Sequence, residues 1–255
     1  MPDKGKAFFC QILSSLFSPP DQGMVEQLSQ GHLHAFFKSY VQSWEGEIEI
    51  LKGFLTHSTA PSPTFEGGVK KRRSGSTLSE LRPSGQRVEG LTQSPPQILL
   101  RDYKEEHHRL FSDTGKERIS LVESFYKPWT QDPHCSLPFA KEKGFLMGDS
   151  AIHLSTLFQH CGLEVAEPFK GMPDHILIEL EFLSYLYREA GDREIKRFIE
   201  DHLDWVPFLK ESFEKAHAHP FYISLIEVLD LFISREKSRL EKKSDGKKDI
   251  HPEVI

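Results

Sequence analysis

Cysteine is scarce in this sequence of 255 residues, which contains only Cys10, Cys135 and Cys161. An odd number of cysteines without a motif spacing does not support a disulfide framework, and it fits a protein that folds in a reducing compartment. The sequence therefore predicts a cytoplasmic protein.

Long hydrophobic runs are also missing, since no stretch approaches the roughly 20 apolar residues of a membrane-spanning helix. The apolar segment from Ala7 to Phe17 follows Lys4 and Lys6 and superficially resembles a signal peptide. No small-x-small cleavage site follows it, and its apolar residues fall on one face of a helix. We interpret this segment as an amphipathic core helix and expect no membrane span.

Recognisable catalytic and metal-binding motifs are absent as well. The sequence has no Gly-x-Ser-x-Gly elbow and no Gly-x-x-x-x-Gly-Lys phosphate loop. His160 and Cys161 are adjacent on a predicted helix, where neighbouring side chains point about 100° apart, so they cannot readily share a zinc ion. We therefore predict no enzyme activity, no metal site and no cofactor.

Strand signals are equally scarce, and helical periodicity takes their place. No Asn-Gly or Asp-Gly turn joins two alternating runs. Apolar residues from Ile176 to Tyr187 recur at the spacing of a helix that buries one face. Pro173 and Asp174 lie just ahead and suit a helix start, because Pro has no amide hydrogen to leave unpaired and a carboxylate complements the exposed N–H groups. Similar patterns elsewhere predict an all-α domain of about ten helices. Besides the helix at 176–187, the predicted helices lie at about 7–17, 21–29, 32–55, 97–111, 119–126, 150–161, 192–203, 206–213 and 220–236.

The region 57–96 differs from the rest in composition. Ser, Thr, Gly and Pro dominate it, and Lys70–Arg73 is a basic run. Such a segment cannot bury enough apolar surface to offset its ordering entropy, so we predict a disordered insert. The basic run is either a solvated loop or a nuclear-import or nucleic-acid patch. The net charge of −6 argues against general nucleic-acid affinity.

Acidic residues outnumber basic ones in the second half of the chain. Residues 145–236 contain 17 Asp and Glu against 8 Lys and Arg, an excess of nine negative charges. An acidic helical surface with aromatic grooves complements a basic segment that carries an apolar stretch, and this favours a binding module. The alternative is an acidic face that only contacts solvent.

Five landmarks together resemble a known family. The landmarks, in order, are Ser124-Phe125-Tyr126-Lys127-Pro128-Trp129, Gly148-Asp149-Ser150, Pro173-Asp174-His175, His202-Leu203-x-Trp205 and His219-Pro220-Phe221-Tyr222. With them the chain resembles, from about Ala7 to Arg235 and apart from the 57–96 insert, the TorD/DmsD/NarJ family of cytoplasmic chaperones that mature molybdenum-containing oxidoreductases.

The resemblance implies how the chain is organised. It implies a TorD-like, all-α fold of about ten helices in two lobes joined by a hinge. The expected segments are 1–56 (N-terminal helices), 57–96 (insert), 97–166 (remainder of the first lobe), 167–175 (hinge loop), 176–241 (C-terminal lobe) and 242–255 (charged tail).

The resemblance also implies a partner. Family members bind the twin-arginine signal peptide and the apo form of a molybdopterin-dependent oxidoreductase subunit, assist cofactor insertion and delay export. We accordingly expect these two partners, no nucleic acid, and a monomer or dimer. The alternative is a helical scaffold or adaptor that binds a folded partner protein.

Transferred to this sequence, the family's peptide-binding site has two parts. Asp174 and His175 lie in the hinge loop, where the Asp would accept charge-assisted bonds from a client arginine. The family often has Glu-Pro-x-Asp-His there, whereas this chain has Gly171 and Met172 in the first two positions. The complete predicted set is Phe125, Pro128, Trp129, Gly148, Asp174 and His175.

Overall fold

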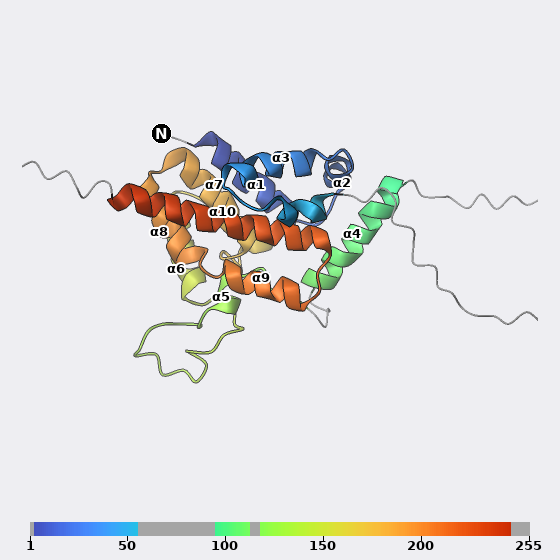
Figure 1. Ribbon diagram of the computed structural model, residues 1–255. Helices are drawn as coiled ribbons and strands as arrows, with labels where there is room; N and C mark the ends of the chain where they lie inside the picture. The colour runs from blue at the N-terminus through green and yellow to red at the C-terminus, as the bar shows by residue number, and fades with distance from the viewer. Residues whose placement is uncertain (1–2, 56–94, 113–117, 246–255) are drawn as a thin grey trace, which may run out of the picture.

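The computed structural model describes residues 3–55, 95–112 and 118–245. In these ranges the chain forms ten α-helices and two short 3-10 helices, η1 and η2, and no strand, which confirms the predicted all-α class (Figure 1). No helix of the described part is long and apolar enough to cross a membrane. The elements are α1 (Lys4–Phe17), α2 (Gln22–Ser29), α3 (His32–Ser43), η1 (Ile48–Phe54), α4 (Pro95–Phe111), α5 (Glu123–Tyr126), α6 (Asp149–His160), η2 (Glu167–Phe169), α7 (Ile176–Glu189), α8 (Asp192–His202), α9 (Val206–Lys215) and α10 (Pro220–Asp245).

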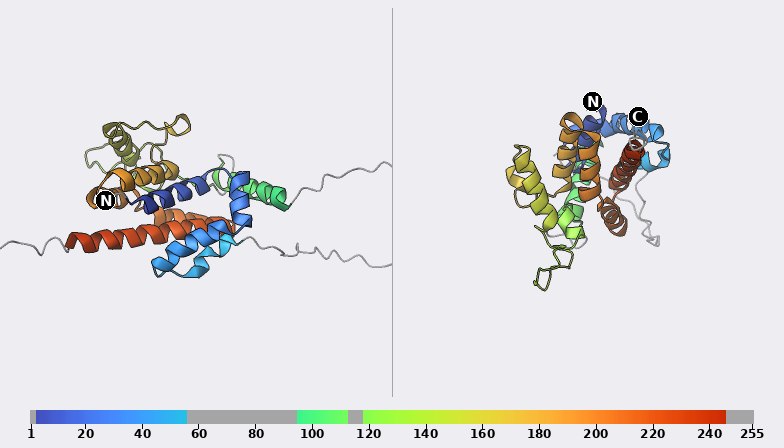
Figure 2. Two further views of the ribbon diagram at one scale, coloured as in Figure 1. Left: turned by 90° about the horizontal axis from the view of Figure 1, so that it is seen from above. Right: turned by 90° about the vertical axis from the view of Figure 1, so that its left-hand side faces the viewer.

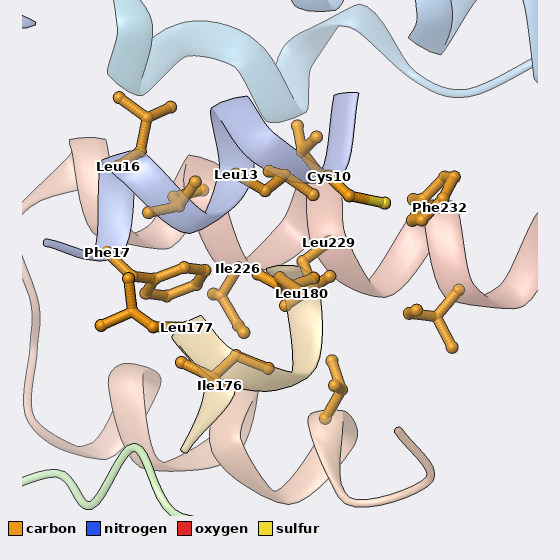
Figure 3. Close-up of a cluster of buried hydrophobic side chains, with 14 of the residues drawn as sticks. Cys10, Leu13, Leu16, Phe17, Ile176, Leu177, Leu180, Ile226, Leu229 and Phe232 are labelled. Carbon is orange, nitrogen blue, oxygen red and sulfur yellow. The ribbon is translucent and has the colours of Figure 1, made fainter. Parts of the chain in front are cut away.

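The core forms where α7 meets α1 and α10. Leu13 of α1, Leu180 of α7 and Leu229 of α10 are fully buried and belong to one continuous cluster of apolar side chains (Figure 3). Burying a leucine side chain of this kind contributes about 1.5–3 kcal/mol. The apolar stripe that the sequence predicts from residue 176 onward is therefore the central packing surface of the molecule.

Aromatic side chains attach α3 to this core. The ring of Phe9 on α1 lies 5.6 Å from Phe37, 5.2 Å from Trp44 and 4.9 Å from Phe232, measured between ring centroids. Rings at these separations add a geometric preference to the apolar area they bury. The contacts hold α1, α3 and α10 together at one end of the fold.

The predicted helix over 32–55 is wrong in its second half. α3 ends at Ser43, and Glu45 adopts a positive φ of 55° where the chain turns. A Cβ atom on Gly46 would lie 2.6 Å from a side-chain carbon of Leu231, so the turn packs closely on α10. The chain then continues as η1, whose Gly53 N–H donates to the Ser224 hydroxyl at 2.9 Å. Tertiary packing on α10 thus overrides the helical periodicity.

The predicted helix over 119–126 is wrong in its first half. α5 covers the second half, whereas residues 119–122 are not helical and Val122 is extended. Val122 forms an isolated antiparallel bridge with His175, and the Ile176 N–H donates to the Leu121 carbonyl at 2.8 Å. Pairing with the segment that enters α7 replaces the helical hydrogen bonds here.

The predicted division into two lobes stays a prediction. The buried cluster includes residues of the 1–56, 97–166 and 176–241 segments. Residues 95–96 of the predicted insert begin α4, and residues 242–245 of the predicted tail end α10. The remainder of the insert and of the tail lies outside the described residues.

Candidate functional site

Three landmarks that are far apart in the sequence meet at one hydrogen-bonded junction. Asp174 is fully buried, and its Oδ2 accepts the backbone N–H of Ser124 at 2.8 Å and also the Ser124 hydroxyl. The Ser124 oxygen in turn accepts the N–H of Gly148 at 3.2 Å. Through these bonds the start of α5, the start of α6 and the entry to α7 are fixed to one another. We call these three residues the Asp174 junction.

Gly148 is required at this junction by space rather than by backbone conformation. A Cβ atom added there would lie 2.6 Å from the carbonyl oxygen of Trp129. That oxygen also accepts the N–H of Asp149 at 2.9 Å, which brings the two backbones close together. The sequence predicts Asp149 or Ser150 as the N-cap of α6, but the cap is Gly148. The Asp149 carboxylate instead accepts the Thr130 hydroxyl at 2.9 Å.

His175, rather than Asp174, caps α7. Its Nδ1 accepts the N–H of Leu177 at 3.2 Å, and its ring lies 4.9 Å from that of Phe169. Burial lowers the pKa of His175 to about 4, so the imidazole is neutral near pH 7. Burial also disfavours the charged form of Asp174 and so raises its pKa, although the hydrogen bonds donated by Ser124 oppose this shift.

These positions correct part of the sequence interpretation. Asp174 lies just outside α7 and does not complement the first turn of that helix. It also presents no surface to solvent, so a client arginine cannot reach it in this conformation. Its role in client binding stays a prediction, and the contacts favour a positioning role.

The remaining predicted residues border a loop, residues 127–148, that projects from the helices beside α5 (Figure 1). Pro128 and Trp129 are half-buried at its base. Among the large apolar side chains that the loop and its neighbours expose, five are considered together, each exposed by 38–49%. The Lys143 Nζ lies 4.8 Å from the centre of the Phe208 ring, which is one of them. Exposed apolar groups gathered in this way mark an interaction surface. This apolar loop surface consists of Phe125, Phe145, Leu146, Met147 and Phe208.

Contacts between aromatic rings support the loop from below. The Trp129 ring lies 5.2 Å from that of Phe139, which lies 5.2 Å from that of Phe145. The Gly144 N–H donates to the Phe125 carbonyl at 2.9 Å, so the returning end of the loop is bound to α5. The apolar loop surface is therefore held by the same segment that carries the Asp174 junction.

A group of buried charges lies behind α5, and the sequence does not predict it. Glu123 is fully buried, and its carboxylate lies 2.9 Å from the Nδ1 of His202 and 2.5 Å from the Nζ of Lys127. Burial by itself raises the pKa of Glu123, but the hydrogen bond and charge of His202 and the charge of Lys127 outweigh it and hold the pKa below its ordinary value. Lys127 also pairs with Asp204 at 2.5 Å.

Glu179 belongs to the same buried group, but its pKa is shifted in the opposite direction to that of Glu123. It is fully buried in α7, and its Oε2 accepts the indole N–H of Trp205 at 3.1 Å. Burial, followed by the charge of Glu123, raises the pKa of Glu179 well above its ordinary value, so the protonated acid is favoured. The sequence contained one signal of this burial. Glu179 follows Ile176 by three positions, which places it on the predicted buried face of the helix.

Metal binding finds no support in this arrangement. The described residues contain no group of three or more His, Cys, Asp or Glu side chains that could hold an ion.

Comparison with known proteins identifies the family. Residues 82–218 match the family model described as nitrate reductase delta subunit, a range that includes all six predicted site residues. The chain belongs to this family. It is also 24% identical over 145 residues to a protein named "Chaperone protein TorD" from Vibrio parahaemolyticus serotype O3:K6 (strain RIMD 2210633), covering 50% of this chain and 67% of that one. The membership confirms the resemblance inferred from the five landmarks.

Proposed function

We propose that this protein is a chaperone that binds the apo form of a molybdopterin-dependent oxidoreductase subunit and its twin-arginine signal peptide, assisting cofactor insertion and delaying export. Membership of the nitrate reductase delta subunit family and similarity to a protein named as a chaperone support the general role. The observation that carries the proposal is the apolar loop surface, whose large side chains are exposed on a segment anchored by the Asp174 junction.

The chemistry of this surface fits the apolar stretch of a signal peptide. Phe125 and Phe145 offer aromatic surface, and Met147 is an adaptable side chain of the kind common at binding surfaces with several partners. Water released from these groups on binding supplies the main driving force. The basic end of the peptide faces the acidic second half of the chain, which contains 17 Asp and Glu against 8 Lys and Arg between residues 145 and 236.

Titration calorimetry tests the proposal with a synthetic twin-arginine signal peptide from a molybdenum oxidoreductase of the same organism. Replacing Phe145 and Met147 together by serine removes exposed apolar area, so we expect the dissociation constant to rise at least about tenfold, as for loss of a binding hot spot. Phe8→Ser is the matched control, because Phe8 is 51% exposed on α1, away from the loop. Equal affinity of the double variant and the wild type would reject this surface as the binding site.

Titration of the protein with the free signal peptide and, separately, with the mature oxidoreductase distinguishes a chaperone from an adaptor. An adaptor would bind the mature, folded oxidoreductase but not the free signal peptide. Binding of the mature enzyme alone would therefore contradict the proposed function and favour the scaffold alternative.

A further inference from the structure

A groove lies between α6, α7 and α8, and none of the apolar loop surface residues lines it. In Figure 2, α6 lies beside α7 and α8, on the side of the molecule away from α2 and α3. The space between them is a groove of about 360 Å³. Its apolar lining consists of Leu157 and Cys161 of the α6 end, Phe182, Tyr185 and Leu186 of α7, and Phe198 of α8. We call it the α6–α8 groove.

The size of the groove sets what it can hold. Its volume falls at the lower end of the roughly 300–1,000 Å³ typical of ligand pockets, so it accommodates large side chains but not a whole helix. Leu157 and Tyr185 are only half-buried, so apolar surface is available at its opening.

The rim of the groove is acidic. Glu189 of α7 and Glu194 and Asp201 of α8 line it, whereas Arg197 is the one cationic lysine or arginine in the lining. Arg197 already pairs with Asp201, its Nε lying 3.4 Å from the carboxylate. Glu189 forms no ion pair within the part of the chain that the structure describes. A cation beside Glu189 would therefore meet an uncompensated carboxylate.

Helix ends add to this negative potential. Cys161 is the C-cap of α6 and Ala190 is the C-cap of α7, and both residues line the groove. The carbonyl groups at a helix C-terminus favour a nearby positive charge. α8 begins at the same end, but its first turn carries Asp192 and Glu194, which offset its dipole.

The other end of the groove is closed by two histidines, His153 of α6 and His202 of α8. The His202 Nε2 lies 2.8 Å from the His153 Nδ1, and both residues line the groove. Burial, followed by the charge of His202, lowers the pKa of His153.

From the apolar walls, the acidic rim and the two helix C-termini we infer that the α6–α8 groove docks a polypeptide segment that places a leucine- or phenylalanine-sized side chain next to a lysine or arginine. The apolar side chain lies against Leu157, Phe182 and Phe198, and the cation lies against Glu189. This site is separate from the apolar loop surface, and the inference does not depend on the identity of the client.

The native cysteines provide a test. Cys161 lines the groove, Cys135 lies in the 127–148 loop, and Cys10 is fully buried. The folded full-length protein is alkylated with N-ethylmaleimide, and each cysteine is followed by mass spectrometry. The probe is a synthetic peptide with a Leu-Phe centre flanked by lysines. At a peptide concentration of about ten times its Kd, we expect alkylation of Cys161 to slow by about tenfold while that of Cys135 is unchanged.

Two control peptides and matched variants define the specificity. Peptides with glutamate in place of lysine, or with serine in place of Leu-Phe, should not protect Cys161. Glu189→Lys combined with Glu194→Lys should raise the peptide Kd at least about tenfold, because attraction becomes repulsion. Glu181→Lys, an exposed α7 residue outside the groove, should leave it unchanged.

Several outcomes would overturn the inference. These are full reactivity of Cys161 at saturating peptide, equal protection by the serine peptide, and unchanged affinity of the Glu189/Glu194 variant. Protection of Cys135 instead of Cys161 would also reject the groove, while leaving the apolar loop surface and the proposed function intact.

Discussion

Asp174 and His175 are neighbours in the sequence but act on different parts of the molecule. Asp174 accepts hydrogen bonds from Ser124 at the start of α5, whereas His175 accepts one from Leu177 in the first turn of α7. The pair thus joins α7 to the segment that carries the loop.

The low pKa of His175 predicts a pH-dependent stability. Between its ordinary pKa of 6.5 and its folded value of about 4, the unfolded chain binds a proton that the folded chain does not. The free energy of unfolding therefore falls as the pH falls through this window. His175→Asn keeps a capping acceptor but cannot titrate, so it should lose less stability in acid. The difference between the two proteins should grow toward about pH 4 and stay below roughly 3 kcal/mol.

Urea denaturation at a series of pH values measures this difference. Asp174 and Glu179 also titrate, but they are present in both proteins and cancel in the comparison. Parallel stability curves for wild type and variant would contradict the assignment.

Gly148 gives a second prediction at the residue scale. Gly148→Ala places a Cβ atom against the Trp129 carbonyl and forces the loop to move. We expect the protein to remain helical by circular dichroism and its affinity for the signal peptide to fall several-fold. Because glycine has no side chain that could contact a client, such a fall would come from the changed position of the loop. Gly171→Ala is the matched control, since nothing lies within 4 Å of its added Cβ atom. Wild-type affinity of the Gly148 variant would show that the Asp174 junction does not position the binding surface.

At the scale of elements, α5 is too short to be stable by itself. It spans four residues, from Glu123 to Tyr126, and isolated helices of this length do not form in water. Its position depends on long-range contacts, such as the hydrogen bond between Glu123 and His202. The Tyr126 ring also stacks on Trp205 at 5.2 Å.

The two buried glutamates predict opposite responses to the same substitution. Glu179→Gln replaces an acid whose raised pKa already favours the neutral form, so its effect on stability should be small. Glu123→Gln removes the buried carboxylate that faces His202 and Lys127 and leaves Lys127 with Asp204 alone. Loss of a buried charge partner costs about 3–5 kcal/mol. Chemical denaturation near pH 7 measures both values. A larger loss of unfolding free energy for the Glu179 variant than for the Glu123 variant would contradict a neutral Glu179 and a charged Glu123.

At the scale of the whole molecule, one apolar core joins the two predicted lobes. Leu180 lies in that core between α1 and α10 (Figure 3). Leu180→Ala should lower the free energy of unfolding by about 2–5 kcal/mol, because it removes buried area and leaves a cavity. Since the core is continuous, wild type and variant should each unfold in one transition that is the same by circular dichroism and tryptophan fluorescence.

Two separate transitions would contradict this expectation. They would indicate instead that the predicted first and C-terminal lobes fold independently.

The sequence by itself determined the features that depend on neighbouring residues. Apolar spacing located α1 and α7. The Asp21 side chain caps α2, and Gly162, with a φ of 67°, follows the C-cap of α6. The five landmarks identified the family, because their order is a property of the chain and needs no knowledge of the fold. The helical class followed from the same local signals.

The tertiary structure alone decided which distant residues meet. Ser124 and Asp174 are 50 positions apart, and Glu123 and His202 are 79 apart, so no local pattern links them. The same reason explains why extended pairing replaced a helix before α5, and why a residue predicted as a client contact proved to be buried. Local propensities are small in energy, and burial of apolar and hydrogen-bonded groups outweighs them wherever distant segments pack together.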